Sequence, residues 1–352
     1  MKATGQRQQA RAKSVRQLPR SEVLSIIFAL CLLLLACCLS CGRAGPRAYV
    51  SNERDGTITV IDTRTDEVVS TIKVGARARG IQVAPDGASV WVALSYPTNR
   101  AQPGEDKIAK IDAGSGRVVA KYDAGTDPES FTLSRDGARL YIANEDAGTC
   151  SVTDVTANRV VASMPVGLEP EGVALSPDGR WVYVTSENSS TVAVIEAATN
   201  RVVKTFLVGA RPREAAFTAD GARAYVTAEN GNSVAVVDTK DHSVVDTIRL
   251  PRGEGAQQLK PKGVAVAPDG ARLYVATGRG NSVAVIAAAS RQLVALVPTG
   301  QRPWGVALTP DGRKLYTANG LSNDVSVIDT TTNKVVKTIK AGDGPWGIAI
   351  KP

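Results

Sequence analysis

Seven short segments of this 352-residue chain place charged or tryptophan side chains on either side of a proline or an alanine. Arginine binds carboxylates through paired hydrogen bonds, and tryptophan rings stack on cations and flat ligands. Brought together, such side chains form a site for a polar or anionic ligand. The segments are Arg77-Ala78-Arg79, Asp127-Pro128-Glu129, Glu169-Pro170-Glu171, Arg211-Pro212-Arg213, Lys260-Pro261-Lys262, Arg302-Pro303-Trp304 and Gly344-Pro345-Trp346.

A repeated Asp-Gly pair shows which elements must position these segments. The pairs begin at residues 86, 136, 178, 220, 269 and 311, so the gaps are 50, 42, 42, 49 and 42. Each unit holds four runs rich in β-branched or aromatic residues and bounded by turn residues, most clearly at 172–176, 181–185, 191–195 and 202–206. A period in the forties with four strands predicts one β-propeller blade per unit.

The ends of the chain indicate how the propeller closes. The last copy of the first strand is followed only by residues 351 and 352, whereas the second strand at 48–51 has no first strand before it. We therefore expect an all-β fold, a seven-bladed β-propeller of four-stranded antiparallel blades, closed by the C-terminal strand joining the N-terminal blade. Its first strands are expected to begin at Gly80, Ser130, Gly172, Glu214, Gly263, Gly305 and Gly347.

The charged and tryptophan segments precede the innermost strands, so their side chains should surround one mouth of the central channel as two rings. Two insertions, within 96–106 and 250–260, fall on the same face, where long loops on a rigid scaffold commonly bind ligands. The alternative is that opposite charges of neighbouring blades pair with one another and bind nothing. The predicted ligand-binding residues are Arg77, Arg79, Asp127, Glu129, Glu169, Glu171, Arg211, Arg213, Lys260, Lys262, Arg302, Trp304 and Trp346.

Residues for metal, redox or triad chemistry are scarce. His242 is the only histidine, and Cys150 is the only cysteine after residue 44. The sequence therefore predicts no catalytic residue, no metal site and no cofactor. Cys150 is expected to be a buried small hydrophobic residue. The acid that ends most third strands is expected to cap a turn, and the aromatic residue of each second strand to pack between blades.

Residues 1–44 have a different composition and are expected to be a leader, with the propeller at 45–352. Basic residues precede the uncharged run 23–39, as in a secretory signal, and residues 34–37 resemble a lipobox with Cys37 as the acylated residue. Cleavage after Ala44 and a retained anchor are the alternatives. This leader carries +6 of the formal net charge of +8, so the propeller is left with 35 Lys or Arg against 33 Asp or Glu. Such a balance predicts no nucleic-acid partner, and membrane contact only through the leader.

The repeat 172–195 resembles the YVTN-repeat β-propeller family, and the resemblance covers residues 48–352. The blade-specific order of 49–53, 127–129, 143–146, 169–172, 211–213, 322–329 and 345–347 looks most like the periplasmic propellers associated with PQQ-dependent alcohol catabolism. Ala78 departs from the proline of that group. The resemblance implies an exported, non-catalytic accessory protein.

These observations predict a binding or scaffold module of the periplasm, lipid-anchored or free. Its partner is expected to be a small polar ligand or an envelope protein, including a periplasmic dehydrogenase system. Two alternatives stay open. One is a lactonase in which Glu171 acts as general base and Arg213 as oxyanion donor. The other is a surface-exposed adhesion or structural propeller.

Overall fold

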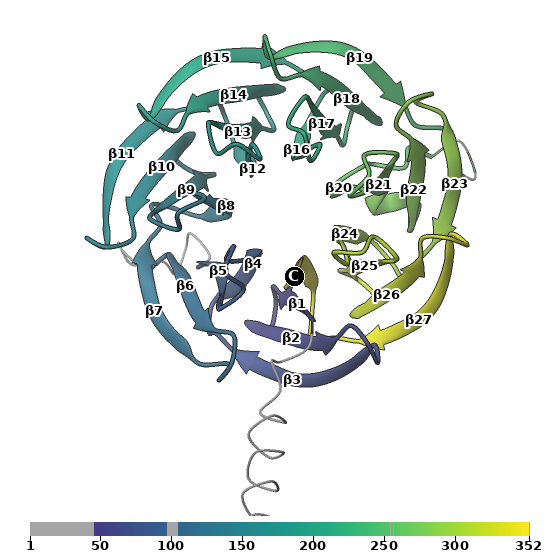
Figure 1. The fold of residues 1–352 in the computed structure, drawn as a ribbon, viewed down its shortest axis with the longest axis horizontal. Helices are drawn as coiled ribbons and strands as arrows, with labels where there is room; N and C mark the ends of the chain where they lie inside the picture. Colours follow the sequence, from purple (N-terminus) through teal and green to yellow (C-terminus); the bar gives the residue numbers. More distant parts are fainter. Residues whose placement is uncertain (1–45, 97–104, 254, 256, 352) are drawn as a thin grey trace, which may run out of the picture. The chain divides into compact units, whose positions relative to one another are not determined.

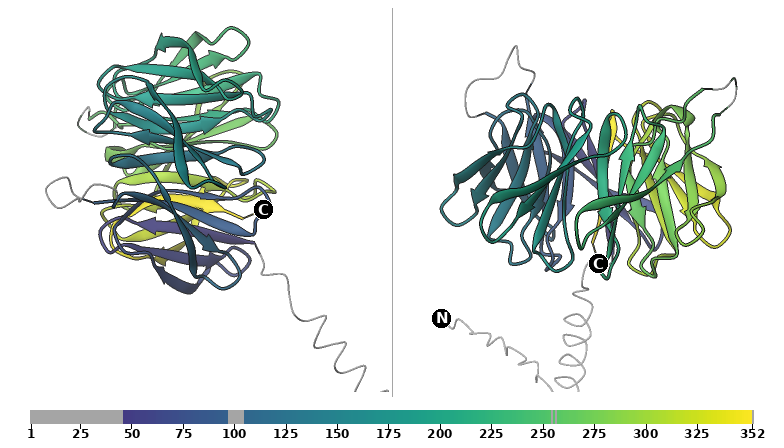
Figure 2. Two further views of the ribbon diagram at one scale, coloured as in Figure 1. Left: turned by 90° about the vertical axis from the view of Figure 1, so that its left-hand side faces the viewer. Right: turned by 90° about the horizontal axis from the view of Figure 1, so that it is seen from above.

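Seven four-stranded antiparallel sheets surround a central channel in the computed structural model (Figure 1). The structure describes residues 46–96, 105–253, 255 and 257–351, and the boundary predicted after residue 44 lies outside these ranges. Each sheet is one blade, and its four strands follow one another in order from the channel to the rim (Figures 1 and 2). The predicted all-β, seven-bladed fold is confirmed. No helix in the described ranges is long and apolar enough to cross a membrane.

The blades are numbered here in chain order. Blade 1 contains β28 (Pro345–Ile350), β1 (Arg47–Asn52), β2 (Thr57–Asp62) and β3 (Glu67–Lys73). Blade 2 contains β4 (Arg77–Val83), β5 (Ser89–Ser95), β6 (Lys107–Asp112) and β7 (Val118–Asp123). Blade 3 contains β8 (Pro128–Leu133), β9 (Arg139–Asn144), β10 (Thr149–Asp154) and β11 (Arg159–Pro165).

The later blades follow the same order. Blade 4 contains β12 (Pro170–Leu175), β13 (Trp181–Ser186), β14 (Thr191–Glu196) and β15 (Arg201–Leu207). Blade 5 contains β16 (Pro212–Phe217), β17 (Arg223–Ala228), β18 (Ser233–Asp238) and β19 (Ser243–Arg249). Blade 6 contains β20 (Val264–Val266), β21 (Arg272–Ala276), the 3₁₀ turn η2 (Gly278–Gly280), β22 (Ser282–Ala287) and β23 (Leu293–Pro298). Blade 7 contains β24 (Pro303–Leu308), β25 (Lys314–Asn319), β26 (Asp324–Asp329) and β27 (Lys334–Lys340).

Blade 1 joins the two ends of the propeller. The C-terminal strand β28 pairs antiparallel with β1, with Ala48 opposite Ile350 and Val50 opposite Ile348. The predicted closure is therefore confirmed, and it covers the edge of β1 that would otherwise be free.

Six innermost strands begin two or three residues earlier than the sequence predicts, and β20 begins one residue later. Five of the early strands start at the proline itself, a position in which its missing N–H costs no ladder hydrogen bond. A bulge follows, for example between Pro170 and Val173 in the pairing with β13. The extra residue in such a bulge re-aims the neighbouring side chains. The charged residue after the proline therefore belongs to the strand and faces the channel region.

The remaining sequence features have the predicted structural roles. The aromatic residues of the second strands are buried, and Tyr141 of blade 3 packs with Val184 of blade 4 in one cluster. Cys150 is a free, fully buried thiol whose pKa burial raises to about 12. The acid that ends a third strand caps its turn, as Asp112 does by accepting the Ser115 N–H at 2.7 Å.

Candidate functional site at the channel mouth

In four blades the turn that enters the innermost strand also positions a glutamate of the same blade. The residue before the proline is left-handed, with φ of 43° at Asp127 and 51° at Glu169. Its carbonyl oxygen accepts the N–H of the residue that follows the second strand, from Glu145 to Asp127 at 3.2 Å and from Glu187 to Glu169 at 2.8 Å. The sequence analysis did not assign these glutamates to the site. Their signal is a glutamate directly after the second strand, at Glu53, Glu145, Glu187 and Glu229.

One side of the channel mouth is organised around Arg79, which is buried. Its guanidinium lies 3.2 Å from Glu53, 3.3 Å from Asp127 and 3.8 Å from Glu145, and it also pairs with the buried Glu129. This group, the Arg79 cluster, consists of Glu53, Arg77, Arg79, Asp127, Glu129 and Glu145.

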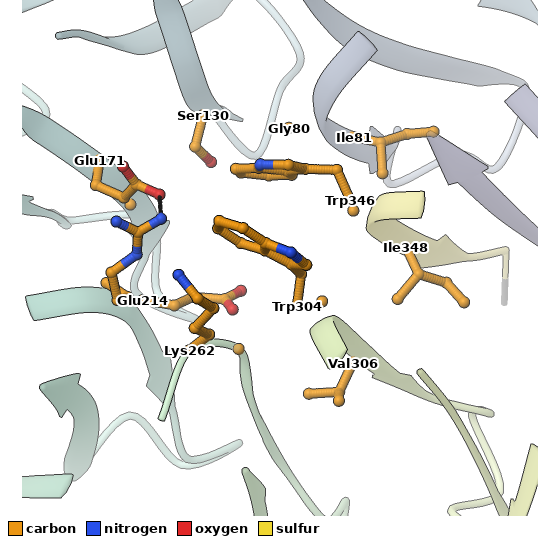
Figure 3. A pocket seen from close by; sticks show the side chains of 15 residues that line it. Gly80, Ile81, Ser130, Glu171, Glu214, Lys262, Trp304, Val306, Trp346 and Ile348 are labelled. Carbon is orange, nitrogen blue, oxygen red and sulfur yellow. Dashed lines mark ion pairs between the residues drawn. The ribbon is translucent and has the colours of Figure 1, made fainter. Parts of the chain in front are cut away.

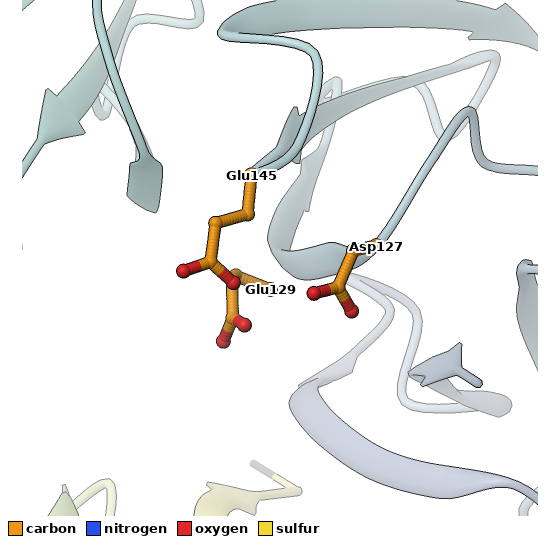
Figure 4. Close-up of side chains that lie close together, drawn as sticks. All are labelled: Asp127, Glu129 and Glu145. Atoms are coloured by element: carbon orange, nitrogen blue, oxygen red, sulfur yellow. The ribbon is translucent and has the colours of Figure 1, made fainter. Parts of the chain in front are cut away.

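Three acids of the Arg79 cluster converge (Figure 4). One carboxylate oxygen each of Asp127, Glu129 and Glu145 lies within 4.8 Å of the others. Burial, together with the charge of Glu171, raises the pKa of Glu145 to about 7. Because Arg79 contacts all three carboxylates, we interpret them as its counter-charges.

A second group of ion pairs links blades 4, 5 and 6 around Arg213. Arg213 lies 2.5 Å from Glu171 and also pairs with Glu187, and all three side chains are at most 7% exposed. Glu229 lies 3.8 Å from Arg213 and 3.1 Å from Lys262, which is 3% exposed. Arg211, whose side chain is more exposed, lies 2.5 Å from Glu187. We call this the Arg213 cluster.

A pocket of about 90 Å³ lies in the central channel beside the Arg213 cluster. The rings of Trp304 and Trp346 stack with their centroids 6.0 Å apart, and both residues are partly exposed. The ammonium of Lys262 lies 3.5 Å from the centroid of the Trp304 ring, and the Arg213 guanidinium lies 5.3 Å from it. Figure 3 shows these two rings facing the Glu171, Glu214 and Lys262 side chains across the pocket.

Two titratable groups of the pocket have strongly shifted pKa values. Burial, and next the charge of Arg213, lowers the pKa of Lys262 to about 7 in spite of Glu229 and Glu171. Burial and the charge of Glu171 raise the pKa of Glu214 to about 7, although the Val264 N–H and Arg213 act in the opposite direction. Shifts of this kind occur where a site is desolvated and charged, which is typical of functional sites.

The thirteen residues predicted as a single ligand site divide into three groups. Five line the pocket: Glu171, Arg213, Lys262, Trp304 and Trp346. Four, Arg77, Arg79, Asp127 and Glu129, belong to the Arg79 cluster. The other four contact the edges of these groups. Arg211 lies 2.5 Å from Glu187 and the Glu169 carbonyl oxygen accepts the Glu187 N–H. Lys260 donates to Asn230 at 2.6 Å, and Arg302 lies 5.2 Å from the Trp304 ring centroid. The lipidation predicted at Cys37 lies outside the described residues.

The pairing of opposite charges between blades, which the sequence offered as the alternative to a ligand site, is present, and the ligand site stays a prediction. Opposite charges do pair between blades in the two clusters. The pairing leaves a pocket, however, whose walls include two tryptophan rings and a carboxyl that the sequence analysis did not single out, Glu214. Its signal was visible, because Glu214 occupies the position that is glycine in five of the seven innermost strands.

Comparison with known proteins supports a β-propeller family. The model of the family described as "Lactonase, 7-bladed beta-propeller" matches residues 199–351, and that of the cytochrome D1 heme domain matches residues 101–223. Each match covers less than half of the chain. The association with the PQQ-linked group receives no support from these matches.

Curated relatives match over 111 residues of the chain. The uncharacterized protein YncE of Salmonella typhi is 31% identical over 32% of this chain and 29% of its own length. The protein NirF of Pseudomonas aeruginosa is 25% identical over 32% of this chain and 27% of its own length. The chain therefore spans less than a third of the length of the curated relatives that it matches.

Solved structures resemble nearly the whole propeller. The periplasmic gluconolactonase PpgL of Pseudomonas aeruginosa superposes with a TM-score of 0.73 at 21% identity, over 87% of this chain and 99% of that chain. Hydrazine synthase of Kuenenia stuttgartiensis superposes with a TM-score of 0.70 at 25% identity, over 80% of this chain and 92% of that chain. At 21% identity, the likeness to PpgL shows the fold alone.

The heme suggested by the second family match does not fit the residues of this channel. His242, the only imidazole of the sequence, lies in the turn between β18 and β19, where its Nδ1 is 2.7 Å from the Tyr183 hydroxyl. The pocket of about 90 Å³ is also smaller than the several hundred Å³ that a site for a drug-sized molecule occupies.

Proposed function

We propose that the protein binds a small cyclic ligand with an anionic or polar group at the channel mouth. The observation that carries this proposal is the partly exposed Trp304–Trp346 stack, with Lys262 3.5 Å from one ring centroid. Stacked tryptophan rings present flat apolar faces, and such faces favour further rings and cations. A ligand ring lies against an exposed face of this stack while its polar group reaches the cationic side of the pocket.

The charges of the pocket favour an anionic group at the Lys262 end. The pKa of Lys262 is lowered to about 7. A carboxylate bound beside it favours the charged ammonium, so the Lys262 amine takes up a proton on binding. The enclosed volume of about 90 Å³ is below the roughly 150 Å³ of a cavity that holds benzene. The pocket therefore encloses one end of a ligand, and the rest extends through the mouth.

The binding proposal is tested by thermal shift of the purified protein with small carboxylates, lactones, sugar acids and PQQ. A ligand that binds only the folded state raises the melting temperature. We expect a stabilising ligand whose effect is lost in Trp304→Ala and Trp346→Ala. The matched control is Trp181→Ala. Trp181 lies on β13, packs against His242 and does not line the pocket. A stabilising effect that survives both pocket substitutions contradicts the proposal.

Hydrolysis of a cyclic ester is the second candidate function. The lactonase family match over 199–351 covers the parts of the pocket that come from β16, from the residues before β20, from β24 and from β28, and the gluconolactonase PpgL shares the fold. The alternative drawn from the sequence used Glu171 as the base. In the structure Glu171 is 2.5 Å from Arg213, and this ion pair favours a supporting role for Glu171. Absence of turnover on a lactone panel excludes this candidate and leaves the binding proposal intact.

The setting of the protein is part of the same proposal. We propose that it is exported to the periplasm and anchored by a lipid on Cys37, as an accessory to PQQ-linked alcohol catabolism. Mass spectrometry of the mature N-terminus tests the anchor, since an acylated Cys37 must be its first residue. Cross-linking in intact cells tests the partner. Recovery of a periplasmic dehydrogenase supports the accessory role, and its absence from the cross-linked products contradicts it.

A further inference from the structure

Glu214 occupies a position where the propeller otherwise requires glycine or serine. The residue directly after each charged or tryptophan segment is glycine in five blades. Neighbouring innermost strands approach closely at this position. A Cβ on Gly172 would lie 2.3 Å from the carbonyl oxygen of Arg213, and one on Gly263 would lie 2.4 Å from that of Trp304. Blade 3 carries Ser130 and blade 5 carries Glu214 instead. Blade 5 therefore places a carboxyl in the channel where the fold itself does not need one.

The Glu214 carboxyl differs from the other acids around the pocket in its partners. Its Oε2 accepts the Val264 N–H at 3.2 Å, whereas Glu171, Glu187 and Glu229 each pair with a cation. Within the described ranges, no cation lies at ion-pair distance from Glu214. The side chain lines the pocket with Trp304 and Lys262 (Figure 3), so its free oxygen is available to a bound molecule.

We infer that Glu214 is the general base of this pocket, and that the reaction is hydrolysis of a cyclic ester held against the tryptophan pair. The inference rests on the proposed binding function and on its second candidate, hydrolysis of a cyclic ester, to which it adds a catalytic residue. A carboxyl with a pKa of about 7 accepts a proton from water near neutral pH and returns it as an acid in the next step.

The reaction balances without a cofactor. The Glu214 carboxylate takes a proton from a water molecule, whose oxygen bonds to the ester carbonyl carbon. The negative charge then moves to the former carbonyl oxygen, where Arg213 and the ammonium of Lys262 are the pocket's donors. When the tetrahedral intermediate collapses, the ring C–O bond breaks and the leaving oxygen takes the proton from Glu214. The product is an open hydroxy acid, which loses its proton to solvent.

The charged groups around Glu214 come from four elements, and they set the pH dependence. Glu171 on β12 and Arg213 on β16 act on its pKa in opposite directions, and Lys262, next to β20, pairs with Glu229 at the end of β17. The active form needs an ionised Glu214. Because the Lys262 ammonium is one of the donors and its pKa is also about 7, the rate is expected to rise as the pH approaches 7 and to fall above 7.

The test measures hydrolysis of δ-valerolactone, γ-butyrolactone and glucono-δ-lactone by the full-length protein in a pH-stat, corrected for spontaneous opening. Binding of the open hydroxy acids is measured separately by calorimetry. We expect Glu214→Gln to lower kcat by about 100-fold or more, to change product affinity less than fivefold and to lose the rise near pH 7. Glu67→Gln is the matched control, because Glu67 lies on the outer strand β3 and is exposed. Glu214→Gly tests folding, since glycine is the residue of five other blades.

Three results overturn the inference, and each differs from failure of the binding proposal. No turnover of any lactone, with hydroxy acids still bound, excludes the reaction. Turnover unchanged in Glu214→Gln, but abolished in Glu171→Gln, assigns the base to Glu171. A rise near pH 7 that persists in Glu214→Gln assigns that titration to another group. If no lactone or hydroxy acid binds at all, the binding proposal fails together with the inference.

Discussion

At the scale of single residues, the channel mouth depends on compensated buried charge. Arg213 faces Glu171 and Glu187, and these side chains are at most 7% exposed. Removing one partner of a buried ion pair leaves the other charge desolvated, which costs about 3–5 kcal/mol. We expect Arg213→Met to lower the free energy of unfolding by about 3 kcal/mol in urea titrations at pH 7. The double variant Arg213→Met, Glu171→Gln should lose less than the sum of the single effects. A single-variant loss below about 1 kcal/mol would contradict a stabilising role for these pairs.

The sign of the Glu214 titration gives a second residue-scale prediction. Folding raises its pKa from 4.5 to about 7, so the fold favours the protonated carboxyl. This stabilising contribution is complete below pH 4.5 and is lost as the pH rises through 7. Since Glu214 is only half-buried, we expect Glu214→Gln to be about 2 kcal/mol more stable than the native chain at pH 8, and equally stable at pH 4.5. A difference that does not change between these pH values would contradict the shifted pKa.

The sequence predicted the residue types of the mouth but not their division into two clusters and a pocket. Spacing alone placed Arg213, Lys262 and Trp304 near one another because each repeats the same position of a blade. It did not reveal that Glu187 and Glu229 reach the neighbouring blade, because this depends on the left-handed turn and on the hydrogen bond that joins it to the second strand. The signal of Glu214 is a single departure from the glycine of five other blades, and a search for recurring residue types passes over it.

At the scale of elements, the packing of neighbouring innermost strands limits what the channel wall can carry. A Cβ on Gly172 would lie 2.3 Å from the Arg213 carbonyl oxygen, so Gly172→Ala pushes β12 away from β16. We expect a loss of about 2 kcal/mol in the free energy of unfolding. Ser130→Ala, at the equivalent position of β8, should change it by less than about 0.5 kcal/mol. Equal effects of the two substitutions in thermal unfolding would contradict the close approach at Gly172.

The innermost strands also show where the sequence alone misplaces the start of a strand. The sequence predicts that each innermost strand begins after the charged segment, because prolines usually mark a turn. The structure starts β12 and β16 at the proline and absorbs the extra residue in a bulge. Strand pairing in this region is set by contact between blades, which a single repeat does not reveal. Blade 6 departs further, since β20 has only three residues.

At the scale of the whole molecule, the ring of blades depends on its closing strand. The edge of β1 is paired only with β28, and Trp346 of β28 also forms half of the tryptophan stack. A chain ending at residue 344 should therefore lose both closure and ligand binding. We expect its melting temperature to fall by roughly 10 °C or more, and the protein to aggregate through the exposed edge.

Two controls separate closure from the pocket. Trp346→Ala keeps the strand, so it should lose the ligand while retaining most of the native melting temperature. Deletion of residues 351 and 352 removes the hydrogen bond from the Lys351 N–H to the Arg47 carbonyl oxygen but leaves β28 paired with β1, and should leave both properties nearly unchanged. A peptide of residues 345–351 added to the truncated chain should restore part of the stability, because it can pair with β1. If the truncated chain melts at the native temperature, the blades hold the ring together without closure, and the C-terminal strand serves the pocket alone.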